Sequence, residues 1–266
     1  MQIVALGHYS RTGKDTFANS LEQHLRRIAP WMSYAKIPLA WKLKQIAYDL
    51  YSWDGLREPE FYDTLEGAPY RDIKLSTVGM TPVEIWGSLG TAAIRDHVYD
   101  RTWLDYLSKS DHGVDVLAVP DIRFPNEFDA FLDAGAVLIQ VVRPGYGPRK
   151  TRADRALMEE HRWHYVIGGT GELSELDYWA LRLAEHLSIG SELPTQTPAE
   201  RKWQLSQQVI QPWEPEPIRH VSPNGAHPES FAYAAEVSWI AAGLGPIPVQ
   251  STHPLIYQAM IDQFGE

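Results

Sequence analysis

The chain opens with MQIVALGHYSRTGKDTFA (residues 1–18), where an uncharged apolar run meets a glycine-containing turn and an amphipathic segment. Residues 3–6 are a candidate strand, and residues 14–28 carry helical periodicity directly after the turn. A turn that ends in Gly13-Lys14 between a strand and a helix aims several backbone N–H groups at one point, where the positive end of the helix also acts. This order therefore predicts a phosphate-binding loop. The alternative is a glycine turn that caps a helix and leaves Lys14 solvated.

Two irregularities distinguish this loop from the common G-x-x-x-x-G-K pattern. Five residues separate Gly7 from Gly13, one more than in that pattern, and Asp15 stands where a Ser or Thr usually ligates Mg²⁺. We therefore expect Asp15, Thr16 or a water that they hold to take the metal. Arg11, inside the loop, either contacts phosphate or points to solvent.

Short apolar runs alternate with amphipathic segments through about residue 188, which is typical of an α/β fold with a mostly parallel central sheet. Further strands are expected at residues 33–37, 114–119, 136–142 and 165–167, and further helices at residues 39–51, 82–94, 102–108, 126–134 and 174–187. Beyond this core, six prolines between residues 194 and 223 exclude one continuous element.

A helical C-terminal extension is expected after the core. Thr197-Pro198-Ala199-Glu200 has the pattern of a capping box, which opens a short helix to about residue 211. Residues 228–242 and 254–264 are predicted as two more helices, each with proline in its first turn.

A second polar cluster lies in VDVLAVPDIRFPNE (residues 114–127), at the end of a predicted buried strand. In parallel sheets ligands bind beyond the carboxyl ends of the strands, so this cluster should lie near the phosphate loop. Asp121 could hold Mg²⁺ or act as a base, and Arg123 could bridge two phosphates. The alternative is an Asp–Arg pair that fixes a turn. Asn126 is expected to cap the next helix.

A basic run, RPGYGPRKTRADR, follows the next strand, although the chain is acidic overall. Phosphoryl transfer spreads negative charge over the oxygens of the moving group, so cations on a flap would stabilise it. We expect a lid with Gly145 and Gly147 as its hinge, rather than a solvated loop. Its cations are Arg143, Arg149, Lys150, Arg152 and Arg155.

Composition narrows the classes of partner. The formal net charge of −10 argues against broad nucleic-acid coating, although a local basic groove stays open. No run approaches the roughly 20 apolar residues of a membrane span, and the start shows no secretory pattern. The chain has no cysteine. These features lead us to expect a cytoplasmic protein.

Four stretches, in order, resemble the bacteriophage deoxynucleoside monophosphate kinases, a branch of the P-loop nucleoside monophosphate kinases. They are GHYSRTGKDTFA, YAKIPLAWKLKQIAYDLYSWDG, TPVEIWGSLGTAAIRDHVYDRTWLDYL and VPDIRFPNEFDAFLDAGAVLIQVVRPG. A fifth, HRWHYVIGGTGELSEL, resembles the strand, turn and last helix that close the family's core. The resemblance covers residues 1–188 and is most specific in GKDT and DIRFPNE. It implies a three-layer P-loop kinase domain with an acceptor-binding arm at about residues 38–110 and a lid at about residues 143–160, and it leaves residues 189–266 without a counterpart.

The resemblance implies ATP·Mg²⁺ as donor and a nucleoside monophosphate as acceptor, for the synthesis of DNA precursors in the host cell cytoplasm. Lys14, Asp121 and Arg123 would then be catalytic. The donor phosphates would bind Arg11, Thr12, Gly13, Lys14, Asp15 and Thr16, with Mg²⁺ near Asp15, Thr16 and Asp121. The acceptor would meet Lys36, Lys42, Trp86 and Arg95.

Parts of this interpretation stay open. Trp86 either packs beside a base or is structural. Gly90-Thr91 precedes Ala92 where we expect relatives to carry an acid, so the acceptor base is undetermined. Two other functions fit the same donor site, namely a kinase that acts on a hydroxymethylated base within DNA and an ATP-binding switch without catalysis. The C-terminal extension could cover a sheet edge, form a homodimer or bind a partner.

Overall fold

A computed structural model describes residues 1–7, 9–64, 66–110, 112–148 and 152–208. The described residues form two compact units, one made of residues 1–43 and 103–208 and the other of residues 44–102. The predicted helices at residues 228–242 and 254–264 lie outside the described residues, as do Arg149 and Lys150.

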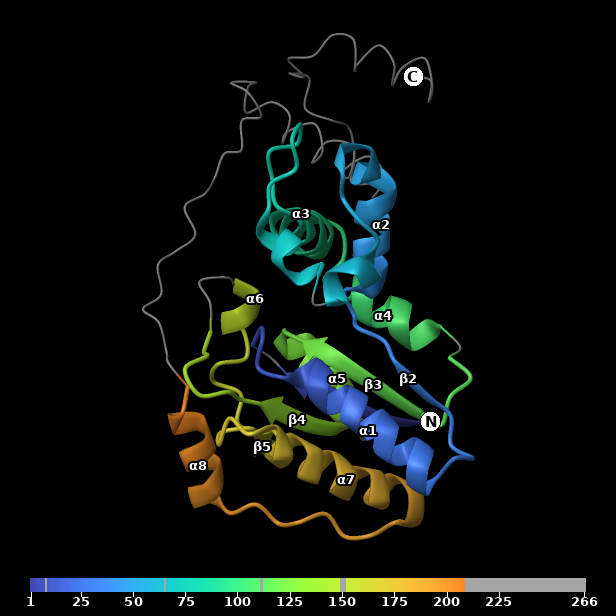
Figure 1. Ribbon diagram of the computed structural model, residues 1–266, viewed down its shortest axis with the longest axis vertical. Coiled ribbons are helices and arrows are strands. Elements are labelled where there is room, and N and C mark those ends of the chain that lie inside the picture. The colour runs from blue at the N-terminus through green and yellow to red at the C-terminus, as the bar shows by residue number, and fades with distance from the viewer. Residues whose placement is uncertain (8, 65, 111, 149–151, 209–266) are drawn as a thin grey trace. The chain divides into compact units, whose positions relative to one another are not determined.

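The first unit is built on a five-stranded parallel sheet (Figure 1). The strands are β1 (Gln2–Gly7), β2 (Tyr34–Lys36), β3 (Val116–Ile122), β4 (Val137–Val141) and β5 (Tyr165–Ile167). Their order is β2-β3-β1-β4-β5, and all four pairings are parallel. The chain moves to one side of β1 with β2 and β3 and to the other with β4 and β5, so the carboxyl end of β1 is the expected ligand position. The prediction of an α/β fold with a parallel sheet is confirmed.

Helices on both faces of the sheet complete three layers. The unit contains α1 (Lys14–Ile28), α4 (Thr102–Lys109), α5 (Pro125–Asp133), α6 (Arg152–Arg155), α7 (Leu173–Ile189) and α8 (Pro198–Ser206). Helices α1 and α7 pack together on one face, and α5 lies on the other (Figure 1). Val4 and Leu6 of β1 share an apolar cluster with Phe17 and Leu21 of α1 and with Leu183 of α7. No helix among the described residues is both long and apolar enough to cross a bilayer.

Strand β3 is longer than the sequence predicts. Its expected end was residue 119, but the strand continues through Pro120 to Ile122. Val119 pairs with Ala5 and Ile122 with Gly7, so β3 advances one residue more than β1. This extra residue is a bulge, one of the places where a sheet accepts proline. Asp121 therefore lies inside the strand rather than beyond it.

The second unit is helical. It contains most of α2 (Trp41–Tyr51), then η1 (Ser52–Asp54), η2 (Pro59–Asp63), η3 (Ala68–Asp72), α3 (Pro82–Gly87) and the π-helical segment η4 (Ser88–Arg95). The single helix predicted at residues 82–94 is thus an α-helix that widens into a π-helix. Thr81 and Glu84 begin it with a capping box, in which each side chain binds the other's backbone N–H. Leu56, Tyr62 and Ile85 are buried at the centre of this unit.

The chain beyond residue 188 continues to pack on the first unit. The capping box predicted at Thr197 is present and begins α8, which ends at Ser206 rather than near residue 211. The side-chain amide of Gln196 pairs with the backbone of Val166 as a neighbouring strand would. It accepts from Val166 N at 2.9 Å and donates to Val166 O at 2.6 Å. This side chain covers backbone groups of the edge strand β5, which would otherwise be open to pairing.

Candidate phosphate-binding site

The turn between β1 and α1 has the geometry of an anion cradle. Gly13 is the N-cap of α1 with a φ of 103°, a left-handed conformation that favours glycine. A Cβ on Gly13 would also lie 3.0 Å from Leu176 Cδ1. The first intrahelical bond joins Phe17 N to Gly13 O at 2.9 Å, and the N–H groups before it belong to the first turn, which a helix cannot satisfy internally. Those amides and the helix dipole favour a phosphate at this point.

Gly7, at the start of the loop, is required by close packing. A Cβ on Gly7 would lie 2.1 Å from Cη2 of Trp163, so only hydrogen fits between the strand and that ring. Trp163 is 2% exposed and makes an edge contact with Phe128 of α5, with ring centroids 4.8 Å apart. The indole therefore supports the loop from behind.

Lys14 is buried at the base of the cradle. It is 6% exposed, and its Nζ donates to Tyr9 O within the loop. Burial and, next, the positive charge of Arg123 lower the pKa of Lys14 to about 7, although Asp15, Asp154 and Asp121 act in the opposite direction. An ammonium in this environment is stabilised by an anion, so the position suits phosphate.

The remaining loop residues divide by exposure. Thr12 is buried, and its Oγ1 donates to Tyr9 O at 3.3 Å. Arg11 is exposed and has a φ of 63°, which is uncommon for a residue with a side chain. Its carbonyl accepts from Arg143 Nη1 at 3.4 Å, so the start of the predicted lid touches the loop.

Asp121 anchors the turn that follows β2. Its Oδ1 accepts from Leu39 N at 2.7 Å and its Oδ2 from Ala40 N at 3.0 Å. The carboxylate thereby fixes the start of the predicted acceptor-binding arm. These contacts account for Asp121 as a positioning group, and its role as a metal ligand or base stays a prediction.

Arg123 is held from two sides. Its backbone N–H donates to Glu127 Oε2 at 2.8 Å, and its Nη1 forms an ion pair with Asp154 Oδ1. The prediction that Asn126 caps the next helix was wrong, because Phe124 is the N-cap and Asn126 lies in the first turn. Glu127 caps the start of α5 instead, because its side chain accepts from the backbone N–H groups of Arg123 and Phe124.

The side chains proposed for Mg²⁺ lie on the exposed start of α1. Asp15 and Thr16 are exposed, and Lys36 Nζ lies 3.4 Å from Asp15 Oδ1 and 2.9 Å from Asn19 Oδ1. Among the described residues no group of three or more His, Cys, Asp or Glu side chains could hold a metal. Mg²⁺ in nucleotide sites needs only one or two protein ligands besides phosphates, so Asp15 and Thr16 fit such a site.

Three lid cations can be placed in the structure. Arg143 stacks on the Tyr146 ring at 4.5 Å, and Arg152 lies 6.0 Å from the centroid of Phe124. Arg155 approaches Met158 Sδ at 4.0 Å. The segment is thus attached to its surroundings by several contacts, and its closure over a nucleotide stays a prediction.

The predicted acceptor residues belong to different parts of the chain. Lys36 is in β2 and Lys42 in the first turn of α2, whereas Trp86 and Arg95 belong to the second unit. Trp86 packs edge-on against Tyr62 with ring centroids 5.1 Å apart, and Lys44 Nζ lies 5.1 Å from its ring. This packing favours the structural interpretation of Trp86. Arg95 is 8% exposed.

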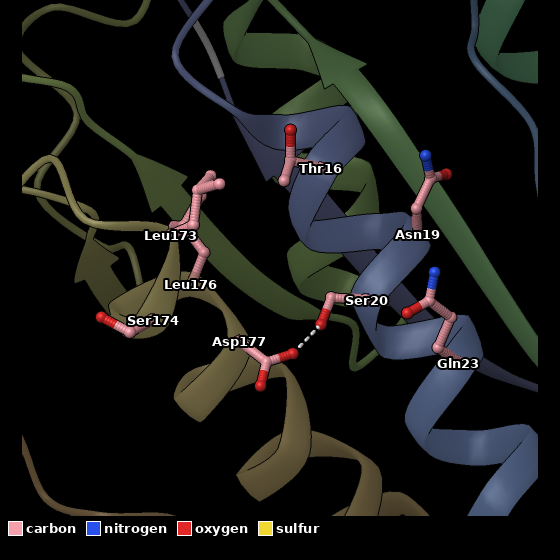
Figure 2. Close-up of a pocket in the computed structure, with 8 residues that line it drawn as sticks. All are labelled: Thr16, Asn19, Ser20, Gln23, Leu173, Ser174, Leu176 and Asp177. Atoms are coloured by element: carbon pink, nitrogen blue, oxygen red, sulfur yellow. Dashed lines mark hydrogen bonds between the residues drawn. The ribbon is translucent and has the colours of Figure 1, made fainter.

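A polar groove of about 480 Å³ adjoins the start of α1 (Figure 2). It lies between α1 and α7 and is lined by Thr16, Asn19, Ser20, Gln23, Leu173, Ser174, Leu176 and Asp177. Ser20 Oγ donates to Asp177 Oδ1 at 2.5 Å, and His24 Nε2 lies 2.8 Å from the same oxygen. The groove begins at Thr16, next to the predicted phosphate-binding loop.

Sequence reasoning missed Asp154 and Trp163, and it placed Glu127 in the second polar cluster without assigning it a role. Asp154 was hidden among the cations of the basic run, and an acid in such a run is the signal that could have indicated it. Glu127 lies two positions after Pro125. An acid at this place in the first turn of a helix can accept from the backbone N–H of the N-cap residue. Trp163 gave no local signal, because its contact with Gly7 joins residues far apart in the chain.

Together, the parallel sheet and the loop between β1 and α1 are consistent with the P-loop kinase fold. The chain is similar to the deoxynucleotide monophosphate kinase of Enterobacteria phage T4, with 37% identity over 94 residues. The aligned region is 34% of this chain and spans 39% of the relative's length. No family model matches the chain.

Proposed function

We propose that this protein transfers the γ-phosphoryl group of ATP·Mg²⁺ to a deoxynucleoside monophosphate and so produces a diphosphate. The observation that carries the proposal is the buried cation Lys14, with the half-buried Arg123 acting on it, beside a glycine loop at the start of α1. The relative's name, deoxynucleotide monophosphate kinase, supports the acceptor class.

On the donor side, the first-turn amides of α1 and Lys14 would bind the outer phosphates. Asp15 and Thr16 would hold Mg²⁺, which neutralises charge on the donor phosphates when bound. The polar groove that starts at Thr16 offers hydrogen-bond partners for the rest of the nucleotide (Figure 2). This division assigns a role to each part of the α1 surface near the loop.

The transfer itself needs alignment rather than a base. An oxygen of the acceptor phosphate attacks the γ-phosphorus while the bond from that phosphorus to the β,γ-bridging oxygen breaks, and ADP leaves with the bond's electrons. The second pKa of a phosphate monoester is about 6, so the attacking oxygen is already ionised at neutral pH. Arg123 would screen the moving group, and Asp121 would position the segment beside it.

The first test measures ADP release from ATP·Mg²⁺ with a panel of acceptors. The panel contains dAMP, dGMP, dCMP, dTMP, their ribose forms and duplex DNA with hydroxymethylated pyrimidine. We expect stimulation by one or more deoxynucleoside monophosphates. Stimulation by the DNA alone would favour a DNA-base kinase, and ATP binding without any stimulation would favour a switch.

The matched variants are Lys14→Ala and Lys109→Ala. Removal of one preorganised charge that acts on the transferred group typically costs about 10² to 10³ in turnover, so Lys14→Ala should lose at least that much. Lys109 is an exposed lysine on α4, and its variant should keep wild-type turnover. Full activity in Lys14→Ala would show that the loop has been assigned the wrong role.

A further inference from the structure

Asp154 is a buried acid in a segment that the sequence marks as cationic. Its carboxylate pairs with Arg123 Nη1, and 5% of its side chain is exposed, compared with 24% for Arg123. The two residues come from α6 and from the loop after β3, so the pair joins two separate elements. A carboxylate buried this deeply is strongly destabilising without a partner, so the pair fixes both positions.

The pair stands beside the phosphate loop, because Ile122, the residue before Arg123, pairs with Gly7 at the start of that loop. Burial and then Arg123 lower the pKa of Lys14, whereas Asp154 is one of the groups that raise it, so the three charges act on one another. Tyr9, whose carbonyl accepts from Lys14, is also affected: burial and then Asp154 raise the pKa of its phenol to about 12. Asp154 therefore belongs to the same charged cluster as the loop lysine.

Geometry lets Arg123 serve two partners. A guanidinium has five N–H donors in a rigid plane, so it can bind a carboxylate with one edge and a phosphate with another. The backbone of Arg123 is fixed by its hydrogen bond to Glu127, whereas the direction of its side chain depends on the groups that bind the guanidinium. Loss of Asp154 leaves the repulsion between Arg123 and Lys14 without this counter-charge, so the guanidinium should move away from the lysine.

We propose that Asp154 is a positioning residue that holds Arg123 toward the phosphate loop, so that this arginine and Lys14 can both contact the transferred phosphoryl group. This inference rests on the proposed function and extends it to an acid on α6. The loop amides and Lys14 bind the donor without Asp154. Its loss should therefore act on the transfer step more than on the affinity for ATP.

The test compares Asp154→Asn with Asp129→Asn. Misplacement of a group by about 1 Å can cost about 10² in rate, so we expect kcat to fall at least tenfold in Asp154→Asn, with KM for ATP changed less than threefold. Asp154→Glu, which keeps the charge, should recover part of kcat. Asp129 also pairs with an arginine, Arg162 at 2.7 Å, but is exposed, and its variant should keep wild-type kinetics.

A double variant decides whether Asp154 acts through Arg123. Arg123→Ala/Asp154→Asn should have the same kcat as Arg123→Ala, because a positioning residue has no effect once its partner is absent. The double variant removes both charges of the pair and should fold even if Asp154→Asn alone does not. Losses that multiply in the double variant would overturn the proposal, as would a fall in kcat that matches the unfolded fraction.

A second readout needs no turnover. Competitive acetylation of Lys14 against pH, followed by mass spectrometry, reports its pKa in the protein alone. Asp154→Asn should lower that pKa and Arg123→Ala should raise it. If the pKa of Lys14 shifts in these variants but the wild-type protein shows no monophosphate-dependent ADP release, the proposed function is contradicted. The interaction between Asp154 and Lys14 is then still supported. A pKa that does not move would overturn the positioning role.

Discussion

At the residue scale, the site depends on the cost of burying Lys14. A lysine whose pKa is held near 7 binds fewer protons in the folded protein than in the unfolded chain, where its pKa is near 10.5. Below about pH 7 this lysine lowers the free energy of unfolding by its full amount. As pH rises from 7 toward 10.5 the penalty disappears, so the free energy of unfolding of the nucleotide-free protein increases with pH over that range. Bound phosphates reverse the preference, because they favour the ammonium form.

We therefore predict that nucleotide binding takes up protons. At pH 8 most Lys14 side chains in the nucleotide-free protein are neutral, so ATP binding should take up about one proton, and at pH 6 much less. Calorimetric titration in two buffers of different ionisation enthalpy measures this number. Lys14→Met should bind ATP more weakly and lose the difference between pH 8 and pH 6. The same uptake in that variant would assign the proton to another group.

Residues of the candidate site could be predicted only where they are adjacent in the sequence. Gly13, Lys14, Asp15 and Thr16 follow one another, and the loop is recognisable from their order. The partners of Asp121 and Arg123 could not be predicted. Leu39 N and Asp154 meet these side chains only after the sheet is assembled.

At the element scale, the turn between β5 and α7 is stabilised by side chains from two helices. Glu175 of α7 accepts from Gly168 N and Thr170 N, both at 3.0 Å, and Gln204 of α8 donates to Glu175 Oε1 at 2.7 Å. Gln204 also accepts from Gly169 N. A helix outside the resemblance thus satisfies one buried backbone N–H of the core, that of Gly169, and orients Glu175.

We predict that Gln204→Ala is destabilising. The change leaves a buried N–H without its partner, which typically costs about 1–3 kcal/mol. Chemical unfolding followed by tryptophan fluorescence measures the difference from wild type. Gln207→Ala, three positions along the chain and nearer solvent, should change stability by less than about 0.5 kcal/mol. Equal stability of the two variants would mean that α8 is not required by the core.

Elements of the first unit could be predicted well because their periodicity is strong. Each of the five strands and each long helix expected up to residue 188 is present. The strand expected to end at residue 119 continues through Pro120, which a bulge accommodates. Helix α8 is anchored by Gln204, whose contacts no pattern in residues 198–206 reveals.

At the scale of the whole molecule, the described chain has two hydrophobic cores. In the second, Tyr62 is 2% exposed, its ring lies 5.4 Å from that of Phe61, and its hydroxyl accepts from Arg57 N at 3.0 Å. Because this cluster is separate from the cluster between α1, α7 and the sheet, damage to one need not unfold the other.

We predict that Tyr62→Ala loosens residues 44–102 selectively. Large-to-small changes of buried aromatic residues cost about 3–5 kcal/mol, and this loss should appear as faster hydrogen exchange in that range. Affinity for an ATP analogue should stay within twofold of wild type, while monophosphate-stimulated turnover falls. Tyr106→Ala, at an exposed position of α4, is the control. Loss of ATP affinity in Tyr62→Ala would show that the two cores unfold together.

The contact between Gly7 and Trp163 restricts how this chain can evolve. Every amino acid other than glycine at position 7 adds a carbon that would overlap the indole, so such a substitution is tolerated only after a smaller residue has appeared at position 163. The reverse order is open, because a smaller residue behind the loop leaves a cavity but no clash. The first glycine of the predicted phosphate-binding loop is thus retained because of a tryptophan more than half the chain away in sequence, and homologues should show the two positions changing together.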